Sequence, residues 1–203
     1  MNKIIVIDYG MGNLRSVKKA LERMNVDALI TSDKNALLAA DKLILPGVGH
    51  FSNGMKNLKD LGLTELLNKK VLQEKAPVLG ICLGMQLFTE FSEEGNCEGL
   101  GFFKAITLKF KFNEQPMKVP HIGWNSVEFE KGCFLDDPVY SNGSFYFVHS
   151  YHVVCEDKKD IIGTTNYGYS FSSAIQKDNI IGVQFHPEKS FQAGLSLLKK
   201  FCS

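Results

Sequence analysis

The sequence has little of what marks several large classes of protein. Its 203 residues contain no apolar run near the ~20 residues that a membrane-spanning helix needs. Lysine and arginine total 23 and aspartate and glutamate 22, so a net charge of +1 gives no basic excess for nucleic acid. The first eight residues are charged too early for a signal peptide and fit a strand better. We therefore expect no nucleic-acid partner and no membrane partner.

Cysteine is also sparse, and its arrangement excludes common site types. Five cysteines are widely scattered without a Cys-x-x-Cys pair, which disfavours a zinc site or a redox dithiol and favours free thiols in the cytoplasm. They are Cys82, Cys97, Cys133, Cys155 and Cys202. His149 and His152 have no carboxylate or cysteine at ligand spacing, and residues 10–13 lack the third glycine of a dinucleotide fingerprint. We expect no metal and no cofactor.

Hydrophobic residues make up 44% of the chain, enough for one domain over residues 1–203. The first half alternates short apolar runs with helical patterns, which is typical of parallel strands with helices on both faces of a sheet. Expected strands are 3–8, 27–31, 42–45 and 78–81. The second half consists mainly of short strand patterns before a last helix at 191–201. This predicts a three-layer α/β fold, with a central, mixed, mostly parallel sheet and antiparallel additions in the second half.

Residues 80–84 (Gly-Ile-Cys-Leu-Gly) follow one of these strands and precede a helical pattern expected to reach about residue 91. A nucleophile between two such glycines is typical of a nucleophile elbow, a sharp strand-to-helix turn on which flanking side chains would collide with neighbouring elements. A helix N-terminus also stabilises a thiolate. Cys82 is thus a candidate nucleophile, although cysteine is more often a small buried hydrophobic residue.

A candidate base and its orienting group occur near the end of the chain. His186 follows an expected strand, and Pro187 restricts it to an extended backbone. Residues two apart on an extended segment face the same way, so Glu188 can lie beside His186 and hold its ring. The alternative is a solvated loop with a proline turn.

Residues 46–49 (Pro-Gly-Val-Gly) follow the third expected strand. Their glycines permit a turn that aims the N–H groups of Val48 and Gly49 outward, and the N–H of Leu83 could complete an oxyanion hole. A plain strand-to-helix turn is the alternative. All three segments follow strands, so they could meet at the carboxyl edge of one sheet.

Taken together, these residues resemble the class I glutamine amidotransferases over nearly the whole chain. Within that class the chain is most similar to the glutaminase subunits of imidazole glycerol phosphate synthases. Five segments carry the resemblance in order: residues 7–14 (IDYGMGNL), 45–49 (LPGVG), 120–125 (PHIGWN), 147–151 (FVHSY) and 186–190 (HPEKS). The resemblance implies the flavodoxin-like fold of that class.

The resemblance also implies a catalytic triad. Cys82 would attack the side-chain amide of L-glutamine and form a glutamyl thioester, His186 would shuttle the proton, and Glu188 would orient His186. The implied oxyanion hole comprises Val48, Gly49 and Leu83, and the implied glutamine contacts are Gly49, Gln86, Ser150 and Tyr151.

The implied partner is a separate (β/α)8-barrel cyclase subunit, bound as a heterodimer. Ammonia would pass to it to make imidazole glycerol phosphate and an aminoimidazole carboxamide ribotide in histidine biosynthesis. Asn13, Trp124 and Lys189 match positions that face the cyclase in this family. The chain departs from the family pattern at residues 50–55, where a small residue and a glycine often follow the glycine loop.

Three other functions stay open from the sequence. Paralogues with the same catalytic residues supply ammonia for amidino-sugar formation in surface polysaccharides. A non-catalytic regulatory relative would usually have lost Cys82, His186 or Glu188, and all three are present. Another thiol hydrolase, such as a peptidase, is disfavoured by the position of Glu188 and by the extended matches.

Overall fold

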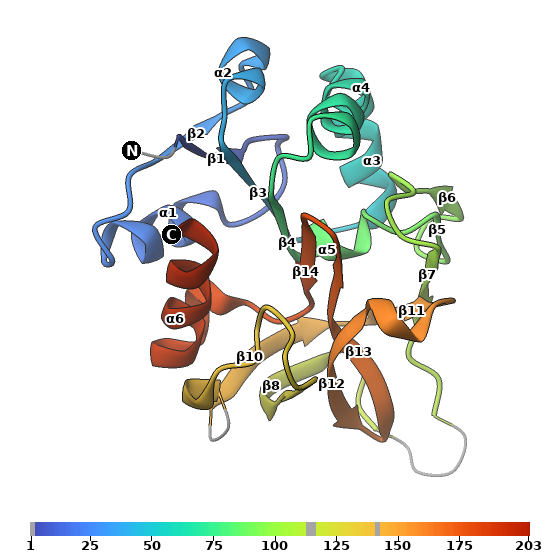
Figure 1. Cartoon of the computed structure of the whole chain (residues 1–203). Coiled ribbons are helices and arrows are strands. Elements are labelled where there is room, and N and C mark those ends of the chain that lie inside the picture. Colours follow the sequence, from blue (N-terminus) through green and yellow to red (C-terminus); the bar gives the residue numbers. More distant parts are fainter. Residues whose placement is uncertain (1–2, 113–116, 141–142) are drawn as a thin grey trace.

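A computed structural model describes residues 3–112, 117–140 and 143–203 of the chain (Figure 1). Its first half alternates strands and helices, as the periodicity predicts. The elements are β1 (Ile4–Ile7), α1 (Leu14–Glu22), β2 (Ala28–Thr31), α2 (Lys34–Leu38), β3 (Lys42–Gly47), α3 (Phe51–Asp60), α4 (Thr64–Leu67), a π-helical segment (Asn68–Gln73), β4 (Val78–Cys82) and α5 (Leu83–Gln86).

The second half is mostly β-structure. Its strands are β5 (Phe91–Ser92), β6 (Cys97–Glu98), β7 (Ala105–Lys109), β8 (His121–Ser126), β9 (Glu128–Phe129), β10 (Ser144–His149), β11 (Tyr151–Cys155), β12 (Ile161–Tyr167), β13 (Tyr169–Lys177) and β14 (Ile180–Val183). Short 3-10 turns lie at Pro138–Tyr140, Lys158–Asp160 and Pro187–Lys189, and α6 (Phe191–Cys202) follows the last of them.

One mixed sheet connects the two halves. Strands β2, β1, β3, β4 and β14 lie side by side in that order and are all parallel. Beyond β14 the sheet continues with antiparallel pairings to β13, β11 and β7, while β8 and β10 form a separate two-stranded antiparallel sheet. The predicted fold class, a mostly parallel sheet with antiparallel additions in the second half, is confirmed.

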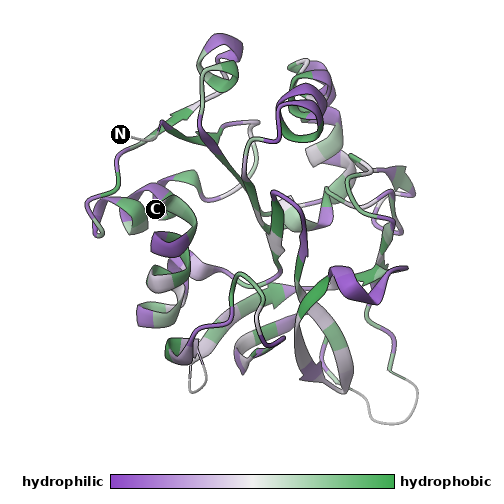
Figure 2. Ribbon diagram, viewed as in Figure 1, coloured by the Kyte–Doolittle hydropathy of each residue, from purple (hydrophilic) through white to green (hydrophobic). Residues whose placement is uncertain are grey.

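Alternate residues of the parallel strands feed two cores, one on each face of the sheet. Ile4 and Val6 of β1 pack in the cluster that includes α1 and α6, whereas Ile5 and Ile7 pack in the cluster that includes α3 and α4. Figure 1 shows these helix pairs on opposite sides of the sheet, which gives three layers. Hydrophobic colour concentrates on the strands and on the helix faces that cover them (Figure 2).

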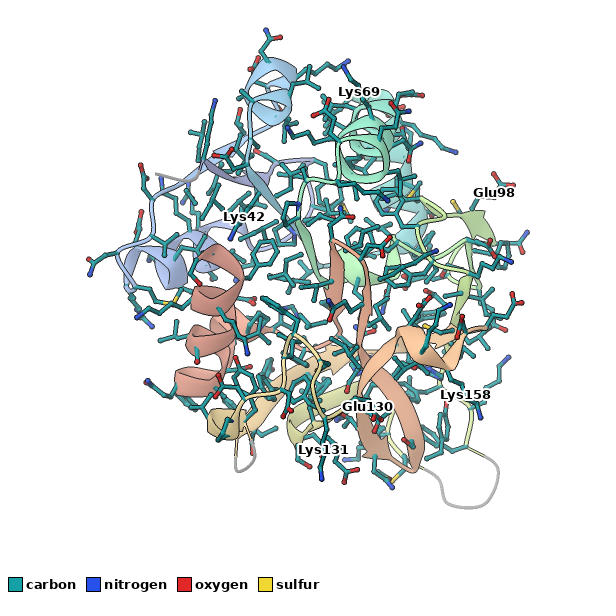
Figure 3. All side chains as sticks on the ribbon, viewed as in Figure 1. Lys42, Lys69, Glu98, Glu130, Lys131 and Lys158 are labelled. Atoms are coloured by element: carbon teal, nitrogen blue, oxygen red, sulfur yellow. The ribbon has the colours of Figure 1, made fainter. Side chains whose placement is uncertain are left out.

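Charged side chains project outward from the layers. Lys69, Glu98 and Lys158 are exposed and extend from the periphery (Figure 3). Within the described ranges, no helix is both long enough and apolar enough to span a bilayer.

The helix after residue 82 is shorter than predicted. We expected it to reach about Phe91, but α5 ends at Gln86. The carbonyl oxygens of residues 87–89 accept hydrogen bonds from the backbone N–H groups of residues 100–103 instead of continuing a helical ladder. The chain therefore turns away early and enters β5.

Candidate active site

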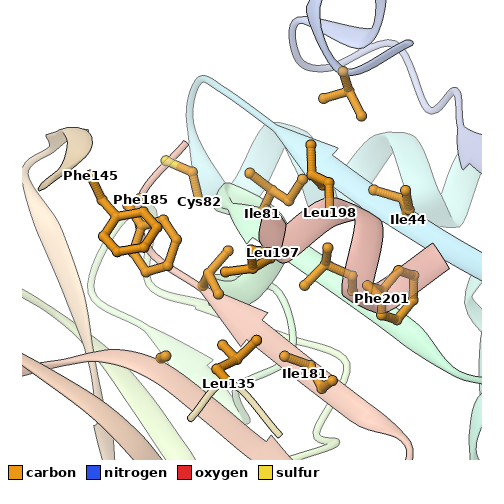
Figure 4. Packing of buried hydrophobic residues seen from close by; sticks show 14 of the residues in the cluster. Ile44, Ile81, Cys82, Leu135, Phe145, Ile181, Phe185, Leu197, Leu198 and Phe201 are labelled. Atoms are coloured by element: carbon orange, nitrogen blue, oxygen red, sulfur yellow. The ribbon is translucent and has the colours of Figure 1, made fainter. Parts of the chain in front are cut away.

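Cys82 stands on a strained elbow between β4 and α5. Its backbone has φ 53° and ψ −107°, and its side chain is 6% exposed. A Cβ at Gly84 would overlap the carbonyl oxygen of Leu45, and one at Gly80 would overlap the ring of Phe88. The expected collisions at both glycines are confirmed. Figure 4 shows Cys82 at the edge of a buried cluster that includes Ile81 and Phe185.

His186 follows β14 in the extended conformation expected before proline, with φ −101° and ψ 93°. Its Nδ1 lies 2.9 Å from Oε1 of Glu188, and both side chains are 2% exposed. The other ring nitrogen, Nε2, is buried and makes no hydrogen bond of regular geometry with a described residue. The sequence thus places the carboxylate beside the ring as predicted, and one ring nitrogen stays available.

The available nitrogen belongs to a ring whose titration depends on Cys82. Burial lowers the pKa of His186, but a Cys82 thiolate and the Glu188 carboxylate raise it by more, to about 10. The raised pKa favours the imidazolium form of His186 at neutral pH.

A cavity of about 380 Å³ opens onto the sulfur. It is lined by Val48, Gly49, Cys82, Leu83, Gln86, Glu94, Pro120, Val148, His149, Ser150 and Tyr151. The structure therefore brings together the candidate nucleophile and every residue that the resemblance implied for the oxyanion hole and for glutamine contacts. His186 and Glu188 are buried and do not line the cavity.

The loop after β3 supplies free backbone donors to this cavity. The N–H groups of Val48 and Gly49 make no hydrogen bond with a described residue, and the N–H of Leu83 belongs to the unpaired first turn of α5. Gly49 has φ +115°, and a Cβ there would lie 2.8 Å from the terminal methyl carbon of Met11. The positive φ favours glycine here, whereas the Met11 methyl group ends a flexible side chain and can move aside.

Two buried glutamine side chains connect the cavity wall to the sulfur. Nε2 of Gln86 donates to the carbonyl oxygen of Tyr151 and to Oε1 of Gln184, at 3.0 Å each. Nε2 of Gln184 in turn donates to Sγ of Cys82 at 3.6 Å. Sequence reasoning missed Gln184. Its signal was a polar residue between Val183 and Phe185, two positions before His186 on the same face of the segment.

Histidines on the opposite wall form a neutral hydrogen-bonded chain. Nδ1 of His121 lies 3.0 Å from Nε2 of His149, whose Nδ1 lies 2.8 Å from the carbonyl oxygen of Tyr151. Because that carbonyl can only accept, Nδ1 of His149 donates to it and Nδ1 of His121 donates to His149. Burial lowers the pKa of His121 to about 4 and that of His149 to about 3. The chain fixes the backbone at residues 149–151.

Metal ligation by His149 and His152 has no support in this geometry. His149 bonds within the chain just described, and Nε2 of His152 lies 2.8 Å from the hydroxyl of Tyr169. Throughout residues 3–112, 117–140 and 143–203, no group of three or more His, Cys, Asp or Glu side chains is arranged to hold a metal ion.

The residues that the resemblance assigned to a partner surface are exposed. Trp124 is 46% exposed and stacks on Phe191, which is 77% exposed, with ring centroids 4.7 Å apart. The amino group of Lys189 lies 5.4 Å from the ring centroid of Tyr146, which in turn contacts Trp124. Asn13 is exposed at the start of α1, which packs against the turn that carries Lys189.

Sequence comparison matches nearly the whole chain to one family. Residues 5–203 match the model of the family "Glutamine amidotransferase class-I". An imidazole glycerol phosphate synthase subunit HisH 2 of Methanococcus maripaludis is 56% identical over 198 residues, covering 98% of each chain. The HisH subunit of Methanocaldococcus jannaschii is 48% identical over 197 residues, covering 97% of this chain and 96% of the other.

Solved structures give the same architecture at low sequence identity. A crystal structure of a glutamine amidotransferase superposes with a TM-score of 0.72 at 19% identity, covering 98% of this chain and 99% of the other. The structure of PurLQS from Thermotoga maritima matches with a TM-score of 0.70 at 16% identity, covering 99% and 98%. These likenesses concern the fold.

Proposed function

The chain belongs to the class I glutamine amidotransferase family, and from that premise we propose that it is the glutaminase subunit of an imidazole glycerol phosphate synthase. The observation that carries the proposal is the 56% identity to a named synthase subunit across 98% of both chains. The whole chain acts as one amidotransferase domain. It releases ammonia from L-glutamine for use by a second subunit in histidine biosynthesis.

The reaction begins with the ion pair of Cys82 and His186. The thiolate attacks the side-chain carbonyl carbon of glutamine, and the carbonyl oxygen becomes an oxyanion held by N–H groups of Val48, Gly49 and Leu83. His186 donates its proton to the amide nitrogen, the C–N bond breaks, and ammonia leaves. A glutamyl thioester remains on Cys82.

Hydrolysis of the thioester restores the enzyme. His186, now neutral, takes a proton from water, and the resulting hydroxide attacks the thioester carbonyl. The C–S bond breaks, glutamate leaves, and the thiolate re-forms beside the imidazolium. Glu188 holds the ring through Nδ1 during both steps and stabilises its positive charge, which its 2.9 Å contact supports.

Substrate binding uses the remaining polar groups of the cavity. Both N–H groups of the Gln86 amide are already engaged, so its Oε1 is the atom free to accept from the substrate ammonium. Glu94 adds a carboxylate to the same cavity. Ser150, Tyr151 and Gly49 line the wall through which the α-carboxylate is held.

We assign the cyclase partner, a (β/α)8-barrel subunit in a cytoplasmic heterodimer, to the exposed face formed by Trp124, Phe191, Lys189 and Asn13. An exposed, stacked aromatic pair is typical of the centre of a protein–protein interface. Trp124→Ala is expected to weaken cyclase binding by about tenfold or more. Lys199→Ala, an exposed change on α6, is the matched control.

The test of the function is glutamate release by the purified chain. Glutamate is measured from the chain alone, then with a histidine-pathway cyclase subunit and its ribotide substrate. Strong stimulation by both supports the proposal. Activity that responds only to a sugar-modifying partner would assign the chain to amidino-sugar formation instead, and an inert chain with every partner would point to a non-catalytic relative.

A further inference from the structure

We propose that Gln184 is a fourth catalytic residue, whose side-chain amide holds the Cys82 sulfur in place and stabilises its negative charge. The inference deepens the proposed glutaminase function and rests on it. Gln184 is fully buried, and its side chain spans from the nucleophile to a residue of the glutamine cavity.

The position of Gln184 follows from strand geometry. Val183 and Phe185 point into the hydrophobic core, so Gln184 and His186, on the opposite face of the same extended segment, both point toward the elbow. The backbone N–H of Gln184 is paired at 2.9 Å with the carbonyl oxygen of Ser173 on β13, which holds the segment in register. Two side chains of one segment therefore converge on a single sulfur atom.

The orientation of the Gln184 amide is fixed by its neighbours. The Tyr151 carbonyl can only accept a hydrogen bond, so Gln86 must present its NH2 group to it. The same NH2 group faces the oxygen of Gln184 at 3.0 Å, which leaves the nitrogen of Gln184 facing sulfur at 3.6 Å. The donor to sulfur is thus set by a chain of contacts that begins at the backbone of residue 151.

A donor in this place serves the sulfur in its charged state. A thiolate sealed in the interior loses its hydration, and an amide N–H aimed at it replaces part of that stabilisation. His186 is the charged neighbour of Cys82, the buried Tyr9 hydroxyl stays neutral because burial raises its pKa, and Glu94 and His149 line the same cavity as Cys82. Of these, only His186 supplies a compensating positive charge.

The chain of amides also connects substrate to nucleophile. An ammonium group bound at Oε1 of Gln86 withdraws electron density from that amide and strengthens its N–H donor toward Gln184. The Gln184 amide is polarised in turn, and its N–H becomes a better donor to sulfur. Gln184 thereby links occupancy of the cavity to stabilisation of the thiolate.

The test is alkylation of Cys82 by iodoacetamide as a function of pH, in the full chain without glutamine or partner. Mass spectrometry of the peptide that carries Cys82 separates its rate from those of the other four cysteines. Gln184→Met keeps the bulk of the side chain and removes the donor. The midpoint of the rate profile should rise by about one pH unit, since a hydrogen bond to a charged group accounts for tenfold or more.

Gln176→Met, the same substitution on the neighbouring strand β13, is the matched control and should leave the profile unchanged. In a glutaminase assay, Gln184→Met should lower kcat about tenfold with KM for glutamine within about twofold. A Cys82 profile identical to that of the unaltered chain would overturn the proposal. If Gln184→Met fails to fold by circular dichroism, Gln184→Leu, also uncharged and without a donor, decides in its place: the same rise in the midpoint is expected, and an unchanged midpoint would overturn the proposal.

The two proposals fail in different ways. A chain that lacks glutaminase activity under every condition yet shows the Gln184-dependent profile would refute the function and keep the contact. A full glutaminase with an unaltered profile in the variant would refute the contact and keep the function.

Discussion

Two histidines near the cavity have pKa values shifted in opposite directions: His186 lies behind the wall that carries Cys82, the thiol wall, and His149 lines the wall formed by residues 148–151. On the thiol wall, the charges of Cys82 and Glu188 outweigh burial and raise the pKa of His186 to about 10. At the wall formed by residues 148–151, burial lowers the pKa of His149 to about 3. His186 is therefore paired with the Glu188 carboxylate at 2.9 Å, whereas His149 belongs to a neutral hydrogen-bonded chain. Burial alone does not decide the charge of a histidine; the nearest partner does.

The thiol wall also differs from the loop at Val48 and Gly49 in how firmly its backbone is held. The thiol wall is built from β4 and β14, adjacent parallel strands in the centre of the sheet. The loop at Val48 and Gly49 has backbone N–H groups without described partners, and Val48 is 39% exposed. The thiol wall is thus held by strand pairing, whereas the loop proposed to supply the oxyanion donors is held less firmly. The following changes test that division.

Replacing the nucleophile should have the largest effect. Cys82→Ala is expected to lower glutamate release by roughly 10⁴-fold or more, because the thioester can no longer form. Circular dichroism should show a retained fold, since alanine removes one small buried group. Full activity in this variant would rule out thioester chemistry. Labelling of Cys155 rather than Cys82 by a glutamine-mimicking electrophile would contradict the assignment equally.

Gly49→Ala tests the loop wall alone. Alanine disfavours φ +115° and its Cβ would press on Met11, so the loop and its donors should move. We expect kcat to fall about 10²-fold, as on loss of one oxyanion donor. The rate of Cys82 alkylation by iodoacetamide should stay within about twofold. Equal losses in both assays would show that the walls are not independent.

Gly84→Ala tests how rigid the thiol wall is. A Cβ would overlap the backbone of Leu45, which cannot move aside as a flexible side chain can. The cost should exceed about 3 kcal/mol in the free energy of unfolding. Gly101→Ala, also at positive φ but facing open space, is the matched control and should cost about 1 kcal/mol. Denaturant titration compares the two, and similar midpoints would refute the steric argument.

The neutral histidine chain predicts a modest loss of stability in acid. The folded pKa values of His121 and His149 lie below the ordinary value near 6.5, so the unfolded chain binds protons first as the pH falls. Between pH 6.5 and 5 each histidine should remove about 1.5 kcal/mol of stability. The stabilisation from His186, whose pKa is raised, is fully present throughout this window.

Urea denaturation at several pH values measures this slope. The double variant His121→Phe and His149→Phe replaces both partners of the pair together and should flatten it. A slope that persists unchanged in the double variant would show that other groups cause it.

Sequence patterns predicted the central sheet and the elbow because both follow local rules. Period-two and period-3.6 patterns locate the parallel strands and their helices. The two glycines that flank Cys82 predict a sharp turn in which neither flanking position has room for a side chain. By contrast, β8 went unpredicted because its pattern is inverted: His121 and Asn125 face inward, while Ile122 and Trp124 face solvent. An exposed apolar face on a strand is typical of a surface that binds another protein.

Other misses depended on contacts distant in sequence. The N–H groups of residues 100–103 bond to the carbonyl groups of residues 87–89, just beyond α5, and no local signal predicts that. The role of Gln184 depends on Gln86 and Cys82, roughly a hundred residues away, so it emerges only when three strands and a helix are assembled.

The closed packing around the elbow has a consequence for how this enzyme can vary over generations. Positions 80 and 84 admit only glycine, so heritable changes there remove the folded protein rather than alter its rate. Variation that tunes the thiol must instead arise at positions 184, 186 and 188, a stretch of five residues on one segment. Most substitutions that adjust the reactivity of Cys82 without unfolding the protein should therefore lie in this one short stretch of the chain.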